Sequence, residues 1–152
     1  MSNVNALVDA VKTAKGEGNV VVVTGKPGCG KSKLVRDAAA QEKWVYVNCR
    51  ELITEKFLAV PAADRGLYAP DMFLEDLKAF KAGVIVLDDL QTLFVPVFHI
   101  NVDSLLRKLS KAKTMVAVWP GVLESGMLCY DKFDGSEAIR ISPDGFSVFD
   151  VK

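Results

Sequence analysis

The order of apolar and polar positions along the chain predicts strands that alternate with helices. The run from Asn19 to Thr24 is continuous and β-branched, with apolar residues toward both faces. This pattern is typical of a central strand in a parallel sheet, because helices cover both sides of such a strand. Further strands are predicted at 44–47, 84–87 and 114–119. The alternation indicates the α/β class, a three-layer sandwich around a mainly parallel sheet.

Apolar residues recur at helical spacing between these strands. The spacing predicts helices over 4–14, 31–41, about 51–58, from 70 or 71 to Gly83, and around Val102 to Leu109. The stretch "PAADRGLYAP" at 61–70 carries two prolines and a glycine, so we expect a loop there.

The C-terminal segment has a different pattern, with turn signals "DG" at 134–135 and "PDG" at 143–145. We expect "EAIRI", 137–141, to be the last strand of the main sheet and "FSVFDV", 146–151, to be an antiparallel addition to it. The prediction is a single domain, 1–152, with a C-terminal β-hairpin around 137–151.

Composition narrows the class of protein. The chain has 152 residues, half of them hydrophobic, which is enough for one domain with its own core. Nineteen basic and nineteen acidic residues cancel, so any DNA binding is expected to be weak or indirect. Three cysteines without a CxxC pair argue against a disulfide framework and a zinc site. No run approaches the roughly 20 apolar residues of a membrane helix, so a cytoplasmic protein without membrane association is expected.

The segment "GKPGCGKS", 25–32, carries the clearest chemistry. It matches GxxxxGK[ST] at every required position and lies between a predicted strand and a predicted helix. Glycines let the backbone bend and point several N–H groups at one spot, where a phosphate fits. The alternative is a glycine-rich turn without a ligand. We expect nucleotide contacts from Gly25, Lys26, Pro27, Gly28, Cys29, Gly30, Lys31, Ser32 and Lys33.

Two side chains of this loop have specific expected roles. Lys31 is predicted to reach the outer phosphates, where it acts as a catalytic residue, and the Ser32 hydroxyl to ligate Mg²⁺. "VIVLDDL", 84–90, supplies acidic partners at the end of another strand. Asp88 is expected to hold the magnesium shell and Asp89 to polarise an attacking water. A helix cap or turn is the alternative for the paired aspartates.

Together, the loop and the "VIVLDD" strand resemble P-loop NTPases of the additional-strand group, which includes AAA+ and signal-transduction ATPases. "YVNCREL", 46–52, is similar to the second-strand segment of origin-recognition-type AAA+ proteins. The resemblance covers about 19–120 and implies the strand order 5-1-4-3-2 with ATP over the C-terminal strand ends. The short chain also resembles the BrxF family, small P-loop proteins of type 3 BREX phage-defence systems, which implies an accessory role beside larger proteins.

The sequence departs from that family pattern at several points. Asp89 stands where AAA+ proteins usually have the longer Glu, and the fourth strand ends in Trp119 instead of a polar sensor. Only about 30 residues follow that strand, mostly strand and turn, so we expect no helical lid. Three arginines are candidates for neutralising the phosphate charge: Arg65, Arg107 and Arg140. For Arg107 the simpler interpretation is a solvent-exposed position on its helix, opposite the leucine stripe.

These departures favour an ATP-binding, slowly hydrolysing switch or motor subunit. Protein partners or self-association would complete its ATP site, since an arginine supplied in trans can raise hydrolysis by about 10³ to 10⁵. A small-molecule kinase and a nucleotide-binding structural module without turnover are the alternatives.

Overall fold

A computed structural model gives the architecture for residues 3–14, 20–25, 30–80, 83–94, 100–111, 114–130, 139–142 and 146–151. The helices are α1 (Asn3–Ala14), α2 (Lys31–Glu42), α3 (Glu55–Leu58), α4 (Arg65–Lys78) and α5 (Val102–Leu109). Short 3-10 helices are η1 (Cys49–Leu52), η2 (Ala62–Asp64) and η3 (Leu90–Phe94). The strands are β1 (Val20–Gly25), β2 (Val45–Asn48), β3 (Val84–Asp88), β4 (Thr114–Val118), β5 (Val122–Glu124), β6 (Met127–Tyr130), β7 (Ile139–Ile141) and β8 (Ser147–Val151).

A five-stranded parallel sheet organises the fold, in the order β2-β3-β4-β1-β8. Val22 in β1 lies beside Ala117 of β4 on one side and Val148 of β8 on the other. The expected order 5-1-4-3-2 is confirmed, with β8 as the fifth strand. The α/β class and the predicted strands at 44–47, 84–87 and 114–119 are confirmed as well, each within a residue or two at its ends.

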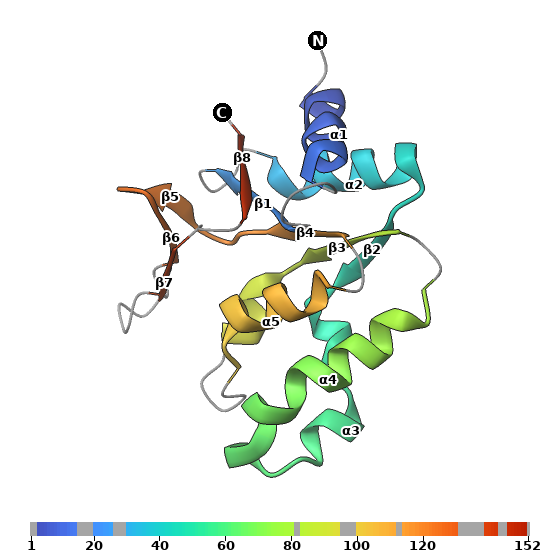
Figure 1. Ribbon diagram of the computed structural model, residues 1–152, viewed down its shortest axis with the longest axis vertical. Coiled ribbons are helices and arrows are strands. Elements are labelled where there is room, and N and C mark those ends of the chain that lie inside the picture. The colour runs from blue at the N-terminus through green and yellow to red at the C-terminus, as the bar shows by residue number, and fades with distance from the viewer. Residues whose placement is uncertain are drawn as a thin grey trace.

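Helices cover both faces of this sheet, α1 and α2 on one side and α3, α4 and α5 on the other (Figure 1). Two separate hydrophobic clusters fill the space between the layers. Val21 and Val23 of β1 pack into the cluster under α1 and α2, whereas Val20 and Val22 pack into the opposite one. Successive side chains of a strand point to opposite faces, which explains why β1 is apolar at every position.

The C-terminal strands correct one prediction. β7 pairs antiparallel with β6 in a separate sheet of order β5-β6-β7, while β8 runs parallel to β1. The expected hairpin around 137–151, with 137–141 in the main sheet, is therefore wrong. Turn signals report only on the local chain. The backbone of the buried strand β1 needs a hydrogen-bonded neighbour on each side, and β4 and β8 supply them. Both turn signals, at 134–135 and 143–145, lie outside the described residues.

The predicted loop at 61–70 is also wrong, because α4 begins at Arg65 and contains Pro70. Ala69, Phe73 and Leu77 are spaced four residues apart and are all buried, and the Phe73 ring lies 5.2 Å from that of Phe57. Burial of this stripe offsets the roughly 3 kcal/mol that a proline inside a helix costs.

The predicted helix at about 51–58 is divided in the structure into η1 and α3. Thr54 begins the second part, since its hydroxyl accepts a hydrogen bond from the Phe57 amide at 3.2 Å. This side-chain cap satisfies an amide that has no partner within the helix, which gives α3 its own start. Among the described helices, none combines the length and the apolar character that crossing a membrane requires.

Gly121 joins β4 to the second sheet through a close backbone contact. A Cβ at this position would lie 1.8 Å from the carbonyl oxygen of Cys129, whereas a Cβ at Gly83 would meet nothing within 4 Å. Gly121→Ala is expected to lower the free energy of unfolding by about 1–3 kcal/mol, the usual cost of overpacking. Denaturant unfolding of both variants measures this, with Gly83→Ala as the control. Equal stability of the two variants would contradict the contact.

Candidate functional site

The carboxyl end of the parallel sheet gathers the predicted site residues. Lys31 and Ser32 open α2 directly after β1, and Asp88 is the last residue of β3. Open parallel sheets bind ligands at this edge, where loops from neighbouring strands meet. Lys26, Pro27, Gly28 and Cys29 lie outside the described residues, so their predicted nucleotide contacts stay predictions.

Gly30 sets the start of α2. Its backbone is left-handed, with φ 90° and ψ 24°, a conformation that strains any residue with a Cβ. The first helical hydrogen bond described runs from the Leu34 amide to the Gly30 carbonyl at 2.9 Å. The N-terminus of α2 thus lies where β1 ends, and a helix N-terminus favours an anion.

Lys31 spans the space between the phosphate loop and the segment after β4. Its Nζ donates to the carbonyl oxygen of Gly25 at 2.8 Å and to that of Gly121 at 3.3 Å. Both are neutral acceptors, which a phosphate oxygen can replace with a stronger, charge-assisted bond. The lysine therefore lies between the end of β1 and the segment after β4, held by backbone groups on two sides.

Ser32 and Asp88 form the pair that sequence reasoning predicted for magnesium. The Ser32 hydroxyl donates to Oδ1 of Asp88 at 3.3 Å, and Asp88 is only 4% exposed. One hydroxyl and one carboxylate are the hard oxygen ligands Mg²⁺ accepts while it keeps several waters. The donor set fits the ion, and Ser32 and Asp88 are the residues that would hold it.

Tyr46 of β2 binds the other oxygen of the same carboxylate. Its hydroxyl donates to Oδ2 of Asp88 and accepts from Nε of Arg36 at 3.3 Å. The Arg36 guanidinium also lies over the Tyr46 ring, 5.4 Å from its centroid. Burial, and then the hydrogen bond to Asp88, raise the pKa of Tyr46 above its ordinary value, so the phenol keeps its proton.

Asp89 has a strained backbone and a crowded side chain. Its φ is 54°, in the left-handed region, and its amide donates to Oδ1 of Asp88 at 2.8 Å. Asn48 donates to Oδ2 of Asp89, and the Arg50 guanidinium lies 3.4 Å from the same oxygen. Gln91 reaches Oδ1 at 3.4 Å. The carboxylate expected to polarise water is held toward the end of β2, so that role stays a prediction.

Lys33, at the end of the predicted nucleotide-binding segment, points away from it. Its Nζ pairs with Asp37 one turn along α2 at 2.8 Å, and its side chain is 80% exposed. Only its backbone remains as a candidate nucleotide contact.

The three candidate arginines all have contacts within the chain. Arg65 donates to the carbonyls of Leu58 and Val60, at 2.9 and 3.1 Å, and so ties α4 to α3. Arg107 pairs with Asp103 at 2.7 Å and lies 4.5 Å from the centroid of the Phe146 ring. Arg140 donates to the Cys129 sulfur at 2.9 Å.

β4 ends at Val118, and the residue after it is Trp119, apolar as the sequence indicated. Trp119 is fully buried, and its indole Nε1 donates to the Cys129 carbonyl at 2.9 Å. This bond fixes the start of the second sheet against β4. The segment reaches the phosphate loop through a backbone group, the Gly121 carbonyl that Lys31 contacts.

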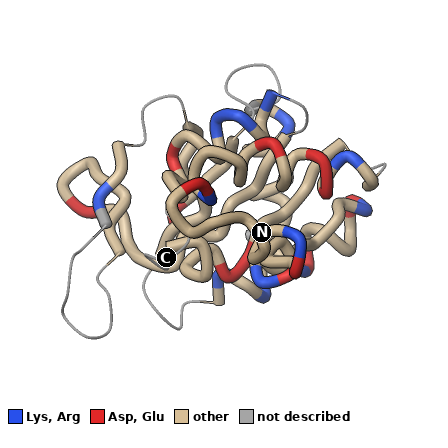
Figure 2. The backbone as a smooth tube through the Cα atoms, turned by 90° about the horizontal axis from the view of Figure 1, so that it is seen from below, with Lys and Arg blue, Asp and Glu red and all other residues tan. Residues whose placement is uncertain are grey.

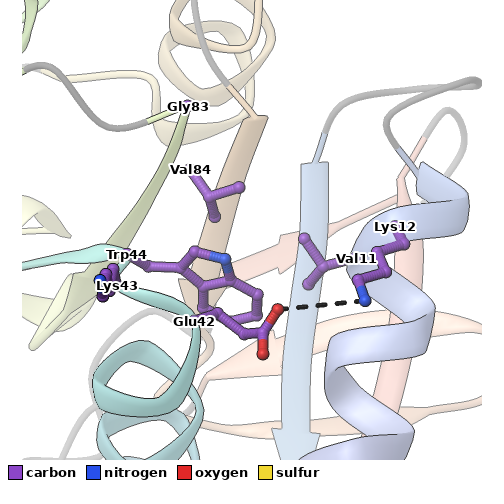
Figure 3. Close-up of a pocket in the computed structure, with 7 residues that line it drawn as sticks. All are labelled: Val11, Lys12, Glu42, Lys43, Trp44, Gly83 and Val84. Carbon is purple, nitrogen blue, oxygen red and sulfur yellow. Dashed lines mark ion pairs between the residues drawn. The ribbon is translucent and has the colours of Figure 1, made fainter.

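A cavity of about 200 Å³ lies at the opposite edge of the sheet (Figure 3). Trp44 before β2 and Val84 at the start of β3 line it, together with Lys12 and Glu42, whose charged groups are 4.0 Å apart. These are amino ends of strands, whereas Ser32 and Asp88 lie at the carboxyl ends. The cavity is therefore separate from the predicted nucleotide site.

Charge is spread over the described molecule. Figure 2 shows basic and acidic positions interspersed around the backbone, in line with the equal numbers of each in the sequence.

Comparison with known proteins identifies the family. The model of the viral superfamily 1 RNA helicase core domain matches residues 21–100, more than half of the chain. The chain belongs to this helicase core family. It is a P-loop NTPase core domain, and the matched segment contains Lys31, Ser32, Asp88 and Asp89. No curated protein sequence matches the chain.

Two solved structures resemble this helicase core domain in fold. C. elegans PCH-2 is 13% identical with a TM-score of 0.48, over 98% of this chain and 41% of its own. A DNA replication initiation factor is 16% identical with a TM-score of 0.45, over 100% of this chain and 47% of its own. The chain thus spans less than half the length of either protein.

Sequence reasoning missed the residues that hold the two aspartates. Tyr46, Asn48 and Arg50 recur at every second position where β2 ends, and β2 lies beside β3 in the sheet, with Asn48 opposite Asp88. For Tyr46 and Asn48 the alternation was a usable signal, since side chains two apart in a strand point to the same face, whereas Arg50 lies in η1. Arg36, one turn after Ser32 on α2, carried no such signal because its partner Tyr46 lies on another element, and Gly121 carried none because it is distant from the site in sequence.

Cys49, the residue after β2, offers a test of how tightly the core of this helicase domain is packed next to Asn48. Its side chain is fully buried in the hydrophobic cluster that also contains Phe57 and Phe73, and burial raises the pKa of its thiol far above the ordinary value. A raised pKa keeps the thiol protonated and unreactive, so iodoacetamide at pH 8 should leave Cys49 unmodified in the native protein. Peptide mass mapping measures this, with the same reaction in denaturant as the control. Rapid native labelling would contradict the packing.

Proposed function

We propose that this P-loop domain binds ATP with Mg²⁺ and hydrolyses it slowly, as a switch or motor subunit that works with protein partners. The observation that carries the proposal is the pairing of Ser32 with Asp88, beside Lys31 at the start of α2. A lysine and a hydroxyl at a helix N-terminus, opposite a buried carboxylate, are the groups that a triphosphate with its metal requires.

Each residue has a distinct task in this proposal. Lys31 exchanges its carbonyl partners for phosphate oxygens, and the amides at the start of α2 bind the same anion. Ser32 and Asp88 hold the metal shell, which when bound neutralises phosphate charge. Asp89 accepts a proton from the attacking water once its carboxylate turns away from β2.

Slow turnover follows from the contacts of Asp89. Three side-chain donors compete for its carboxylate: Asn48, Arg50 and Gln91. Since Asp is one methylene shorter than Glu, it also has less reach toward a water. An event that draws Arg50 away would free the carboxylate, and contact with a partner protein or a second copy of the chain is the event we propose.

We also propose which partners this domain works with. The resemblance to BrxF-type proteins supports a role in bacterial phage defence beside larger BREX proteins, in the cytoplasm. The helicase family name points to RNA as a second ligand to test. Because charge is balanced and dispersed, we expect single-stranded RNA and duplex DNA to bind the isolated domain weakly and to change its turnover little.

Lys31→Ala is expected to abolish ATP binding, because the cation next to the phosphates is lost. Lys43→Ala, a surface cation at the far end of α2, is the matched control and should bind ATP like the wild type. Titration calorimetry with Mg²⁺ and ATP measures both. Equal binding by the wild type and the Lys31 variant would contradict a phosphate site at this loop.

Arg50→Ala is expected to raise ATP turnover about two- to fivefold, the factor that matches about 0.5–1 kcal/mol for a partly exposed ion pair. Asp89→Ala should leave binding intact and lower turnover by about 10²-fold or more, since the proton acceptor is lost. Phosphate release without any acceptor is the measurement, over a protein concentration series, with Lys56→Ala as the surface control.

These turnover measurements also separate the alternatives. Slower hydrolysis by the Arg50 variant would show that Arg50 assists the reaction instead of restraining Asp89. Phosphate transfer only in the presence of an acceptor would favour a small-molecule kinase. Binding without turnover at any protein concentration, with candidate partner proteins present, would favour a structural nucleotide module. Specific activity that rises with concentration supports a site completed by a second copy.

A further inference from the structure

We propose that Tyr46 is a positioning residue for the magnesium site, holding the Asp88 carboxylate in the orientation that serves the metal, with Arg36 ordering the Tyr46 hydroxyl. The inference rests on the proposed function and adds two residues to it. Neither belongs to the phosphate loop or to the acidic strand, and both act through Asp88.

The direction of each hydrogen bond in this chain of contacts is fixed by chemistry. A guanidinium only donates and an ionised carboxylate only accepts. Arg36 must therefore donate to the Tyr46 oxygen, and Tyr46 must give its single proton to Asp88. The hydroxyl has no second proton to place elsewhere, so the Arg36 contact orients it toward the carboxylate.

Sheet register and helix periodicity bring the three groups together. Tyr46 pairs with Val86 and Asn48 with Asp88, so Tyr46 lies two pairs back from Asp88 on the neighbouring strand. Ser32 and Arg36 are four residues apart on α2, on the same face of the helix. The helix thus holds Asp88 twice, directly through Ser32 and indirectly through Arg36 and Tyr46.

The two carboxylate oxygens have different surroundings. Oδ1 faces the Ser32 hydroxyl and the Asp89 amide, at 3.3 and 2.8 Å, which places it on the side of the start of α2. Oδ2 is held by Tyr46. Without the phenol, this buried carboxylate can rotate and offer the wrong oxygen. Loss of such an outer partner of a metal ligand typically lowers metal affinity about 10- to 100-fold.

Tyr46→Phe keeps the ring and its packing and removes only the hydroxyl. Binding of a fluorescent ATP analogue is measured at increasing Mg²⁺ concentration and again in EDTA. We expect the variant to need about tenfold more Mg²⁺ for half-maximal enhancement of binding. Its binding in EDTA should equal that of the wild type, which a merely structural defect would not allow. Tyr68→Phe, on the exposed surface of α4, is the matched control and should titrate like the wild type.

Arg36→Ala tests the second link. It should shift the Mg²⁺ titration in the same direction by a smaller factor, and it should add no shift to Tyr46→Phe, because Arg36 acts through the hydroxyl. Fully additive shifts would overturn the Arg36 part of the inference.

The outcomes for Tyr46 are distinguishable from failure of the proposed function. An unchanged Mg²⁺ titration in Tyr46→Phe would overturn the positioning role, and so would an equal loss of binding with and without Mg²⁺. A wild-type protein that binds no nucleotide under either condition would instead contradict the proposed function itself.

Discussion

A buried carboxylate must be surrounded by donors, and the arrangement of the candidate site follows from this requirement at Asp88. The side chain is nearly inaccessible at the end of an apolar strand, where an unpaired charge would be costly. Donors from three places satisfy it: Ser32 on α2, Tyr46 on β2 and the amide of Asp89. The same convergence brings the start of α2 and the end of β3 together.

The left-handed backbone at Asp89 gives the two neighbouring aspartates different environments. Asp88 continues the strand and faces the start of α2, whereas Asp89 turns back toward the end of β2. A strained conformation of this kind persists only when surrounding contacts hold it. Asp88 is thereby oriented toward the start of α2, and the Asp89 carboxylate is held by the donors at the end of β2.

The small second sheet is connected to the site through backbone groups. Trp119 anchors the segment after β4 through the Cys129 carbonyl, and the absence of a Cβ at Gly121 permits the close approach that follows. The Gly121 carbonyl then contacts Lys31. Lys31 is therefore in direct contact with the connection between the two sheets.

The sequence alone determined the class of fold and the positions of the main strands, and its resemblance to a known family implied their order. A strand apolar on both faces, a glycine-rich turn and a second acidic strand are local signals with few physical solutions. Only the tertiary structure decided that β8 pairs with β1, that α4 continues through Pro70, and that Tyr46, Asn48 and Arg50 hold the aspartates. Strand partners, burial that offsets a proline, and contacts across strands depend on residues distant in the chain, and local patterns do not encode them.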